Sequence, residues 1–294
     1  MKKKLRHYIP NVILTILLVF VMMGTEVVIL ADRIALNPNT FVYISDQQKL
    51  DERGYAKLTD YFRTRANSTG IPESVFLDAF TAEDLRSGIA YNLASSLAYL
   101  KGSRAEATTD IDFTKLDAAV TDFFVQYAEE NGYEQDEMFQ QKLAATISEA
   151  QAQIVECADP FRFQTLRANG WLAKGRTAVG YLGTALIAGI AGAALLIVLL
   201  ILLNLHQAEH LCYWIGLASF TAGLLLAAPC IYLTATDYFS GFAFKDPQVF
   251  PAIVTLLRLL TSRCLTIAIV TFFVGIIGMA GFAFIRAVQR EEEE

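Results

Sequence analysis

The sequence predicts an all-α integral membrane protein: four transmembrane helices, with an α-helical extracytoplasmic domain inserted between helices 1 and 2. Hydrophobic residues make up 54% of the 294 residues and charged residues only 18%, and the mean hydropathy is +0.39. These values are typical of multi-pass membrane proteins. Four runs are apolar over the roughly 20 residues that a helix needs to cross a bilayer core of about 30 Å. The chain between the first two runs is polar, with helical periodicity.

Residues 9–31 form the first predicted span, after a basic N-terminus of residues 1–8. A secretory signal peptide has an apolar core of about 7–15 residues. This run is close to a full membrane thickness and lacks a clear A-x-A-like site, so we interpret it as an uncleaved signal anchor. The positive-inside rule places the N-terminus in the cytoplasm, because its basic residues are Lys2, Lys3, Lys4 and Arg6.

Alternation across the membrane then gives the rest of the topology. Arg286 and Arg290 in the C-terminal tail support this orientation, whereas Lys174 and Arg176 beside the second span oppose it. Residues 248–262 fit either an interfacial helix or an outward extension of the last span. The predicted segments are an extracytoplasmic helical domain at 32–176, a second span at 177–203, a cytoplasmic turn at 204–210, a third span at 211–235, an outer loop with an interfacial helix at 236–264, a fourth span at 265–285 and a cytoplasmic tail at 286–294.

About five helices are predicted in the external domain. Thr81 and Asp84 suit the start of a helix that continues with leucines on one face. The next helix follows Asp112, and its predicted stop is Asn131-Gly132. Its expected core face carries Leu116, Val120, Phe123 and Tyr127, and a third helix carries Phe139, Leu143, Ile147, Ala150 and Ile154.

Two further helices complete the domain. One opens at the capping-box pattern of residues 45–48, and one begins near Pro160 and runs into the second span. FVYIS at residues 41–45 is β-branched and aromatic, so we expect an extended segment there. Stripes of apolar residues at helical spacing are typical of a core. The alternative is a small-ligand site with a polar lining of Tyr91, Asn92, Ser95 and Ser96.

Residues 206–210 read HQAEH, which matches the H-x-x-E-H zinc-peptidase pattern. His206 and His210 can share a helix face and are the weak metal-ligand candidates. A hydrolase also needs a third ligand and a cavity around the activated water. Here the match lies in a short turn between two spans, and the following chain is almost wholly apolar until Asp237. We therefore expect an interfacial turn, with no catalytic residues, metal or cofactor.

Glu26 is a carboxylate inside the first span, where an unpaired charge is costly. An intramembrane ion pair with Arg258 or Arg263 would offset that cost. The alternatives are a carboxyl group that reaches the outer interface and a place in a transport path.

Among the four cysteines, Cys157 alone falls in the external domain, which excludes a disulfide framework there.

Small residues recur in two of the spans and predict close helix packing, because association in lipid depends on van der Waals contact. The same faces permit self-association into a homo-oligomer. The predicted packing residues are Ala185, Gly189 and Ala193 in the second span and Gly275, Gly278 and Gly281 in the fourth.

The net charge of −6 argues against a nucleic-acid partner. The order of segments, without any motif residue, is similar to that of cell-division permease subunits of ABC systems and of tetraspan receptors. However, the cytoplasmic turn is too short for the ATPase-coupling element, and Cys157 has no partner for a tetraspanin-type outer domain. We therefore expect a non-enzymatic protein of the cell membrane that contacts lipid and binds a protein partner through residues 32–176. The alternative is a transport or permease component with Glu26 in the membrane path.

Overall fold

The structure, a computed structural model, describes residues 2–205, 208–243 and 246–293. Helices make up 83% of it, and the described residues contain no strand. The chain divides into two compact units. The membrane unit consists of Met1–Asn37, Val179–Phe242 and Leu257–Glu294. The helical domain consists of Pro38–Ala178 and Ala243–Leu256.

Four helical segments in the described residues are long and apolar enough to cross a membrane, which confirms this part of the predicted fold and indicates a multi-pass membrane protein. The helices are α1 (Lys2–Leu30), which continues into a π-helical turn, η1 (Ala31–Ala35), then α10 (Leu182–Leu203), α11 (Ala208–Ala235) and α12 (Val249–Glu293). The apolar segments are Tyr8–Ala35, Trp171–Leu203, His210–Ala235 and Val249–Gln289.

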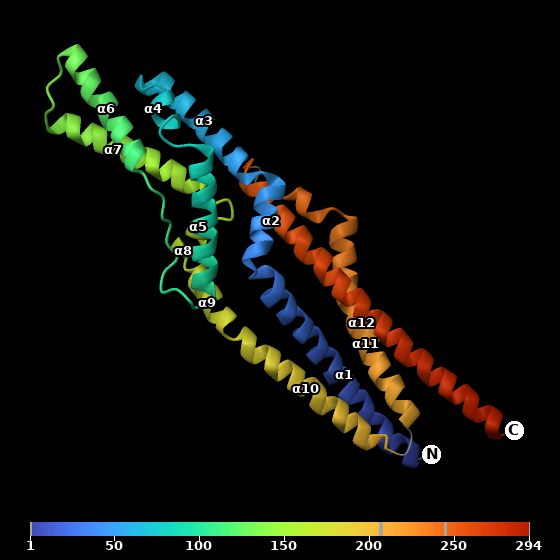
Figure 1. Ribbon diagram of the computed structural model, residues 1–294. Coiled ribbons are helices and arrows are strands. Elements are labelled where there is room, and N and C mark those ends of the chain that lie inside the picture. Colours follow the sequence, from blue (N-terminus) through green and yellow to red (C-terminus); the bar gives the residue numbers. More distant parts are fainter. Residues whose placement is uncertain (1, 206–207, 244–245, 294) are drawn as a thin grey trace. The chain divides into compact units, whose positions relative to one another are not determined.

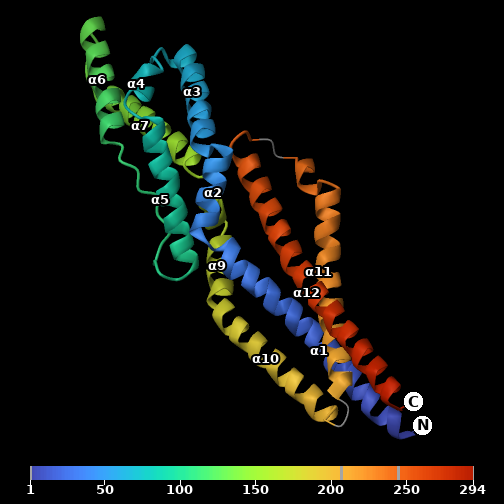
Figure 2. The same ribbon diagram turned by 45° about the vertical axis from the view of Figure 1, so that its right-hand side comes forward.

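In the membrane unit, α1 packs against both α10 and α11, and Figures 1 and 2 show α1 and α10 side by side. Leu18 of α1, Leu200 of α10 and Ala218 of α11 are buried in one apolar cluster. Large apolar side chains on the outer faces are exposed, among them Ile187 (71%) and Ile277 (70%). This arrangement suits a bundle whose surface contacts lipid tails.

Glycines let α11 and α12 approach at backbone distance. A Cβ atom added to Gly216 would lie 2.8 Å from the backbone nitrogen of Met279, and one added to Gly278 would lie 3.0 Å from the Cα of Gly216. Gly275 and Gly223 face the backbone of the opposite helix in the same way. The close contact predicted for Gly275 and Gly278 is therefore present, with partners in α11 that the sequence did not identify.

The other predicted packing residues differ among themselves. Gly189 of α10 faces Thr25 of α1, and Ala193 packs against the buried cluster. Ala185 is exposed, and a Cβ atom on Gly281 would have nothing within 4 Å. Each of these two lies one turn beyond the glycine that makes the contact, Gly189 and Gly278 respectively, so close packing through them stays a prediction.

A pair of buried amides also links α1 to the end of α10. Asn11 Nδ2 donates to Asn204 Oδ1 at 3.2 Å, and Asn204 Nδ2 donates to Asn11 Oδ1 at 3.0 Å. Asn204 Nδ2 also donates to the carbonyl of Leu200. Polar side chains between spanning helices contribute to their association. Asn204, which the sequence placed in a turn, therefore holds two helices together.

The described residues of the helical domain contain seven complete helices and most of an eighth, α9, and the core is formed mainly by α3, α4, α5, α6 and α7. Phe62 of α3 and Phe76 of α4 stack in it with ring centroids 4.3 Å apart, beside the fully buried Leu58, Leu85 and Ile154. The helices are α2 (Pro38–Gln48), α3 (Leu50–Thr69), α4 (Ser74–Leu77), α5 (Ala82–Leu100), α6 (Thr114–Asn131), α7 (Glu137–Cys157), α8 (Phe163–Ala168) and α9 (Trp171–Gly180, whose last two residues belong to the membrane unit).

Helix ends set by local side chains agree with the sequence. Thr81 and Asp84 form a reciprocal capping box at the start of α5. Gly132, with φ of 68°, ends α6 directly after Asn131. The N-cap of α6 is Phe113, one residue after Asp112, and the Asp112 carboxylate accepts the N–H of Thr114.

The extended segment expected at residues 41–45 is instead helical, within α2. Phe41 and Ile44 lie three residues apart and are 4% and 0% exposed, so burial on one helix face outweighs their strand propensity. Residues 45–48 end α2 instead of starting a helix, and Lys49, with φ of 50°, separates α2 from α3.

One further segment differs from the prediction, and another decides between two alternatives. The helix expected from Pro160 is interrupted at Gly170, which has φ of 72°, so α8 and α9 are separate. Of the two alternatives for residues 248–262, the structure has the outward extension of the last span, since α12 runs unbroken from Val249. The first part of α12, together with the residues before it, belongs to the helical domain, which the sequence did not indicate.

Replacing Gly275 by alanine should destabilise the membrane unit by about 1–3 kcal/mol, because the new methyl group forces α11 and α12 apart. Gly281→Ala is the matched control in the same helix, where the methyl group has free space. Thermal unfolding of both variants in detergent, followed by circular dichroism, checks this. Equal melting temperatures would contradict the assigned contact.

Candidate functional site

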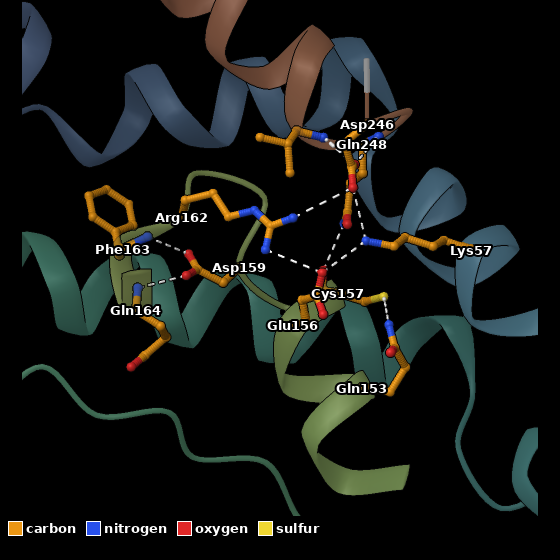
Figure 3. A network of polar contacts seen from close by, with 11 residues as sticks. Lys57, Gln153, Glu156, Cys157, Asp159, Arg162, Phe163, Gln164, Asp246 and Gln248 are labelled. Atoms are coloured by element: carbon orange, nitrogen blue, oxygen red, sulfur yellow. Dashed lines mark hydrogen bonds and ion pairs between the residues drawn. The ribbon is translucent and has the colours of Figure 1, made fainter. Parts of the chain in front are cut away.

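A polar cluster attaches residues 246–248 to the helices of the domain (Figure 3). Residues far apart in the sequence meet here, and the charged groups pair with one another. We call this cluster the 246–248 clamp. It comprises Asp246 and Gln248, the side chains of Lys57, Glu156 and Arg162, and the backbone carbonyls of Leu50 and Cys157.

Gln248 is the buried centre of the clamp, with 1% of its surface exposed. Its Nε2 donates to the carbonyl of Leu50 at 3.0 Å and to that of Cys157 at 2.7 Å. Cys157 is the last residue of α7, so its carbonyl lacks an intrahelical partner. Gly54 makes room for this amide, because a Cβ atom there would lie 2.5 Å from Gln248 Nε2.

Asp246 makes both the helix cap and the ionic contacts. Its Oδ1 accepts the N–H groups of Gln248 and Val249, each at 3.0 Å, which caps the start of α12. Its Oδ2 lies 3.0 Å from Lys57 Nζ and 3.6 Å from Arg162 Nη2. Figure 3 shows the carboxylate directed towards both cations.

The surroundings of Asp246 favour its ionised form. Burial raises the pKa of this carboxyl, but hydrogen bonds from Val249 N–H, Lys57 and Gln248 N–H outweigh that effect, and the pKa lies below its ordinary value. Burial opposes the charge on Lys57 as well. The bonds to Asp246 and Glu156 nevertheless hold the pKa of Lys57 above its usual range.

Cys157 and Asp159 lie beside the clamp and are buried. Burial raises the pKa of the Cys157 thiol to about 11, so the reactive thiolate is scarce at neutral pH. Asp159 accepts the N–H groups of Phe163 at 2.9 Å and Gln164 at 2.7 Å, at the start of α8. Burial raises the pKa of Asp159 despite these two bonds. Both groups hold the chain in place and suit no nucleophilic role.

The loop between α6 and α7 carries a different kind of surface, which we call the acidic aromatic tip. Tyr127, Tyr133 and Met138 are 52%, 62% and 62% exposed, and Tyr127 stacks between Phe123 and Tyr133 with centroids 6.2 and 6.1 Å away. Tyr127 was expected in the core, and its exposure shows that this prediction was wrong. Ala128, the next residue of α6, is 1% exposed, and adjacent helix positions point about 100° apart, so the ring of Tyr127 turns away from the buried face.

Acidic residues surround these rings. Residues 116–141 contain seven acidic residues and no lysine, arginine or histidine. Five of the seven are exposed next to the rings. Figures 1 and 2 show this loop at one extremity of the helical domain. The five are Glu129, Glu130, Glu134, Asp136 and Glu137.

Among the described residues, Glu26 forms no ion pair with Arg258 or Arg263. Glu26 Oε1 accepts a hydrogen bond from Thr271 of α12, whereas Arg258 pairs with Asp237 at 2.6 Å. Arg263 lies eight residues before Thr271, about 12 Å along the helix, so it cannot share that site. Glu26 Oε2 is buried without a partner among the described residues. A transport role for Glu26 stays a prediction.

The other candidates give no site in the described residues. His206 lies outside them, and the ring of His210 packs against Phe282 with centroids 5.5 Å apart. No group of three metal-ligating side chains occurs in the part of the chain that the structure describes, and its four cysteines are free.

The suggested polar lining of α5 is mostly occupied by bonds within the domain. Asn92 donates to the carbonyl of Ala158 at 3.1 Å, and Ser95 Oγ accepts the N–H of Thr108 at 2.8 Å. Tyr91 accepts a hydrogen bond from Arg104. Ser96 Oγ is buried and has no partner among the described residues.

Replacing Gln248 by leucine should open the clamp, because it leaves the buried carbonyl of Cys157, at the end of α7, without its donor at a cost of about 1–3 kcal/mol. In a chain with Cys212, Cys230 and Cys264 replaced by alanine, labelling of Cys157 by a maleimide should accelerate about 10- to 100-fold. The exposed Gln140→Leu is the control. A labelling rate equal to that of the control would show that the hydrogen bonds of Gln248 do not protect Cys157.

The clamp should also depend on pH through Asp246. Since the pKa of Asp246 is depressed, its contribution is present above the unfolded value of about 3.9 and is lost as pH falls below it. Asp246→Asn should cost about 1 kcal/mol at pH 7. This cost should shrink at pH 3.5 and below.

Melting temperatures of the full chain and of Asp246→Asn at pH 7, 5 and 3.5 measure this difference. The exposed Asp122→Asn is the control. A difference that grows as the pH falls would contradict the assignment.

No protein-family model, curated protein or solved structure matches this chain.

Proposed function

We propose that this chain is a non-enzymatic protein of the cell membrane whose helical domain lies outside the cytoplasm and binds a protein partner with a basic surface. The observation that carries this proposal is the acidic aromatic tip, where Tyr127, Tyr133 and Met138 are each more than half exposed. Tyrosine and methionine are enriched in protein interfaces, and buried tyrosines often dominate binding energy.

The charge of the tip defines the partner. Residues 116–141 carry seven acidic residues and no basic one, so complementary charges on a partner would speed association and fix its orientation. An anionic membrane surface would be repelled by the same charges. A basic protein surface with apolar pockets for the tyrosines is therefore the matching occupant.

The basic N-terminus supports the proposed orientation. Lys2, Lys3, Lys4 and Arg6 precede the first span, and the positive-inside rule keeps such residues in the cytoplasm. The helical domain then projects to the other side, where the tip is available to a partner in the envelope or at the cell surface.

Photo-crosslinking in the native membrane tests the proposal with the intact chain. A benzoylphenylalanine residue at Tyr133 should give one discrete protein adduct, and the same probe at Tyr43, which is similarly exposed at 55%, should not. Combined Glu129→Lys, Glu130→Lys and Glu134→Lys should reduce the adduct at least about 10-fold, since the attraction becomes repulsion.

Two results would contradict the proposal. One is an adduct that contains only this chain, which would make the tip a contact between copies. The other is a yield at Tyr133 equal to that at Tyr43. Circular dichroism of the charge-reversal variant ensures that the helical domain remains folded.

A further inference from the structure

Basic side chains gather where the helical domain leads into α10. They come from the loop after α5 and from α8 and α9, and all five are within the domain. We call this group the basic collar. It consists of Lys101, Arg104, Arg167, Lys174 and Arg176.

Backbone and ring contacts fix the collar in place. Arg167 and Arg176 donate to the carbonyls of Ala107 and Ala105. The Arg176 guanidinium lies 4.8 Å from the ring centroid of Tyr99, and Lys174 Nζ lies 4.6 Å from that of Trp171. Each contact leaves other N–H donors of the same cation available.

The collar carries a clear excess of positive charge. Glu106, 3.9 Å from Arg167, is the acidic residue that contacts it, and Asp110 follows further along the loop. No aspartate or glutamate occurs between Asp159 and Glu209 in the sequence. Residues 160–208, which include α8 and α9, therefore contain no acidic side chain that could neutralise the cations of these two helices.

The position of the collar along the chain matches the headgroup layer. The 22 residues of α10 cover about 33 Å, which is enough for the hydrocarbon core. Arg176 precedes Leu182 by six residues, about 9 Å of helix. Trp171, 60% exposed beside Lys174, is the aromatic type that is enriched at that depth.

We propose that the basic collar binds the phosphate groups of anionic phospholipids. Two cations on α9, next to a span, and two on the facing loop form a surface that complements a layer of phosphodiesters. Arginine and lysine near a membrane surface each strengthen attraction to anionic lipid. In the proposed orientation, this lipid contact also accounts for basic residues on the side of the membrane where the positive-inside rule disfavours them. The inference is independent of the proposed protein partner.

Lipid titration of the purified full chain in detergent tests the collar. Phosphatidylglycerol should raise the melting temperature and remain bound in native mass spectrometry, whereas phosphatidylcholine should do neither. Combined Lys174→Gln and Arg176→Gln should weaken phosphatidylglycerol binding about 10- to 30-fold. Combined Lys115→Gln and Lys142→Gln removes the same charge elsewhere in the domain and should leave binding unchanged.

Three results would overturn the proposal. They are equal effects of the two lipids, equal losses in both double variants, and an equal melting-temperature shift with inorganic phosphate alone. The last result would indicate an anion site that does not recognise lipid. Maleimide labelling of Cys157 at the unaltered rate shows that the collar variants retain the fold of the domain.

Discussion

Backbone carbonyl and N–H groups that leave water need partners, and this constraint shapes both units of the chain. In the membrane unit, the apolar segments meet it by being helical, because lipid offers no alternative donor or acceptor. In the helical domain, side chains meet it at the helix ends. Thr81 caps α5, Asp136 caps α7 and Asp246 caps α12. Gln248 then supplies the donor for the last carbonyl of α7.

Contacts between the spanning helices are polar or made by small residues. Lipid tails solvate leucine as well as a neighbouring helix does, so close backbone approach and hydrogen bonds provide the specificity. The glycines of α11 and α12 allow the close backbone approach, and the paired amides of Asn11 and Asn204 form the hydrogen bonds. Glu26 and Thr271 add a hydrogen bond between α1 and α12.

Features with a local cause could be predicted from the sequence. The length of the apolar runs predicted four spans, and the capping box at Thr81 and the stop at Gly132 depend on neighbouring residues alone.

Features with distant partners could not be predicted. Gln248 contacts Cys157 and Leu50 across 91 and 198 residues, and the pattern around Gln248 contains no sign of either. Tyr127 has helical spacing with the core of α6, but it is 52% exposed, and spacing alone does not show how far along a helix the core extends. The acidic run of residues 116–141 was the available signal for the tip.

The discontinuity of the helical domain has a consequence for biosynthesis. The carbonyl of Cys157 has no donor from Gln248 until that residue is synthesised, 91 residues later. At translation rates of about 5–20 residues per second, this delay is roughly 5–20 s. During that interval α10 and α11 are made, and the earlier part of the domain lacks the donor for the Cys157 carbonyl and the carboxylate of Asp246 in its ion-pair cluster. The last segment of the domain therefore arrives as part of the final membrane helix. Completion of the helical domain is thereby linked to synthesis of that helix.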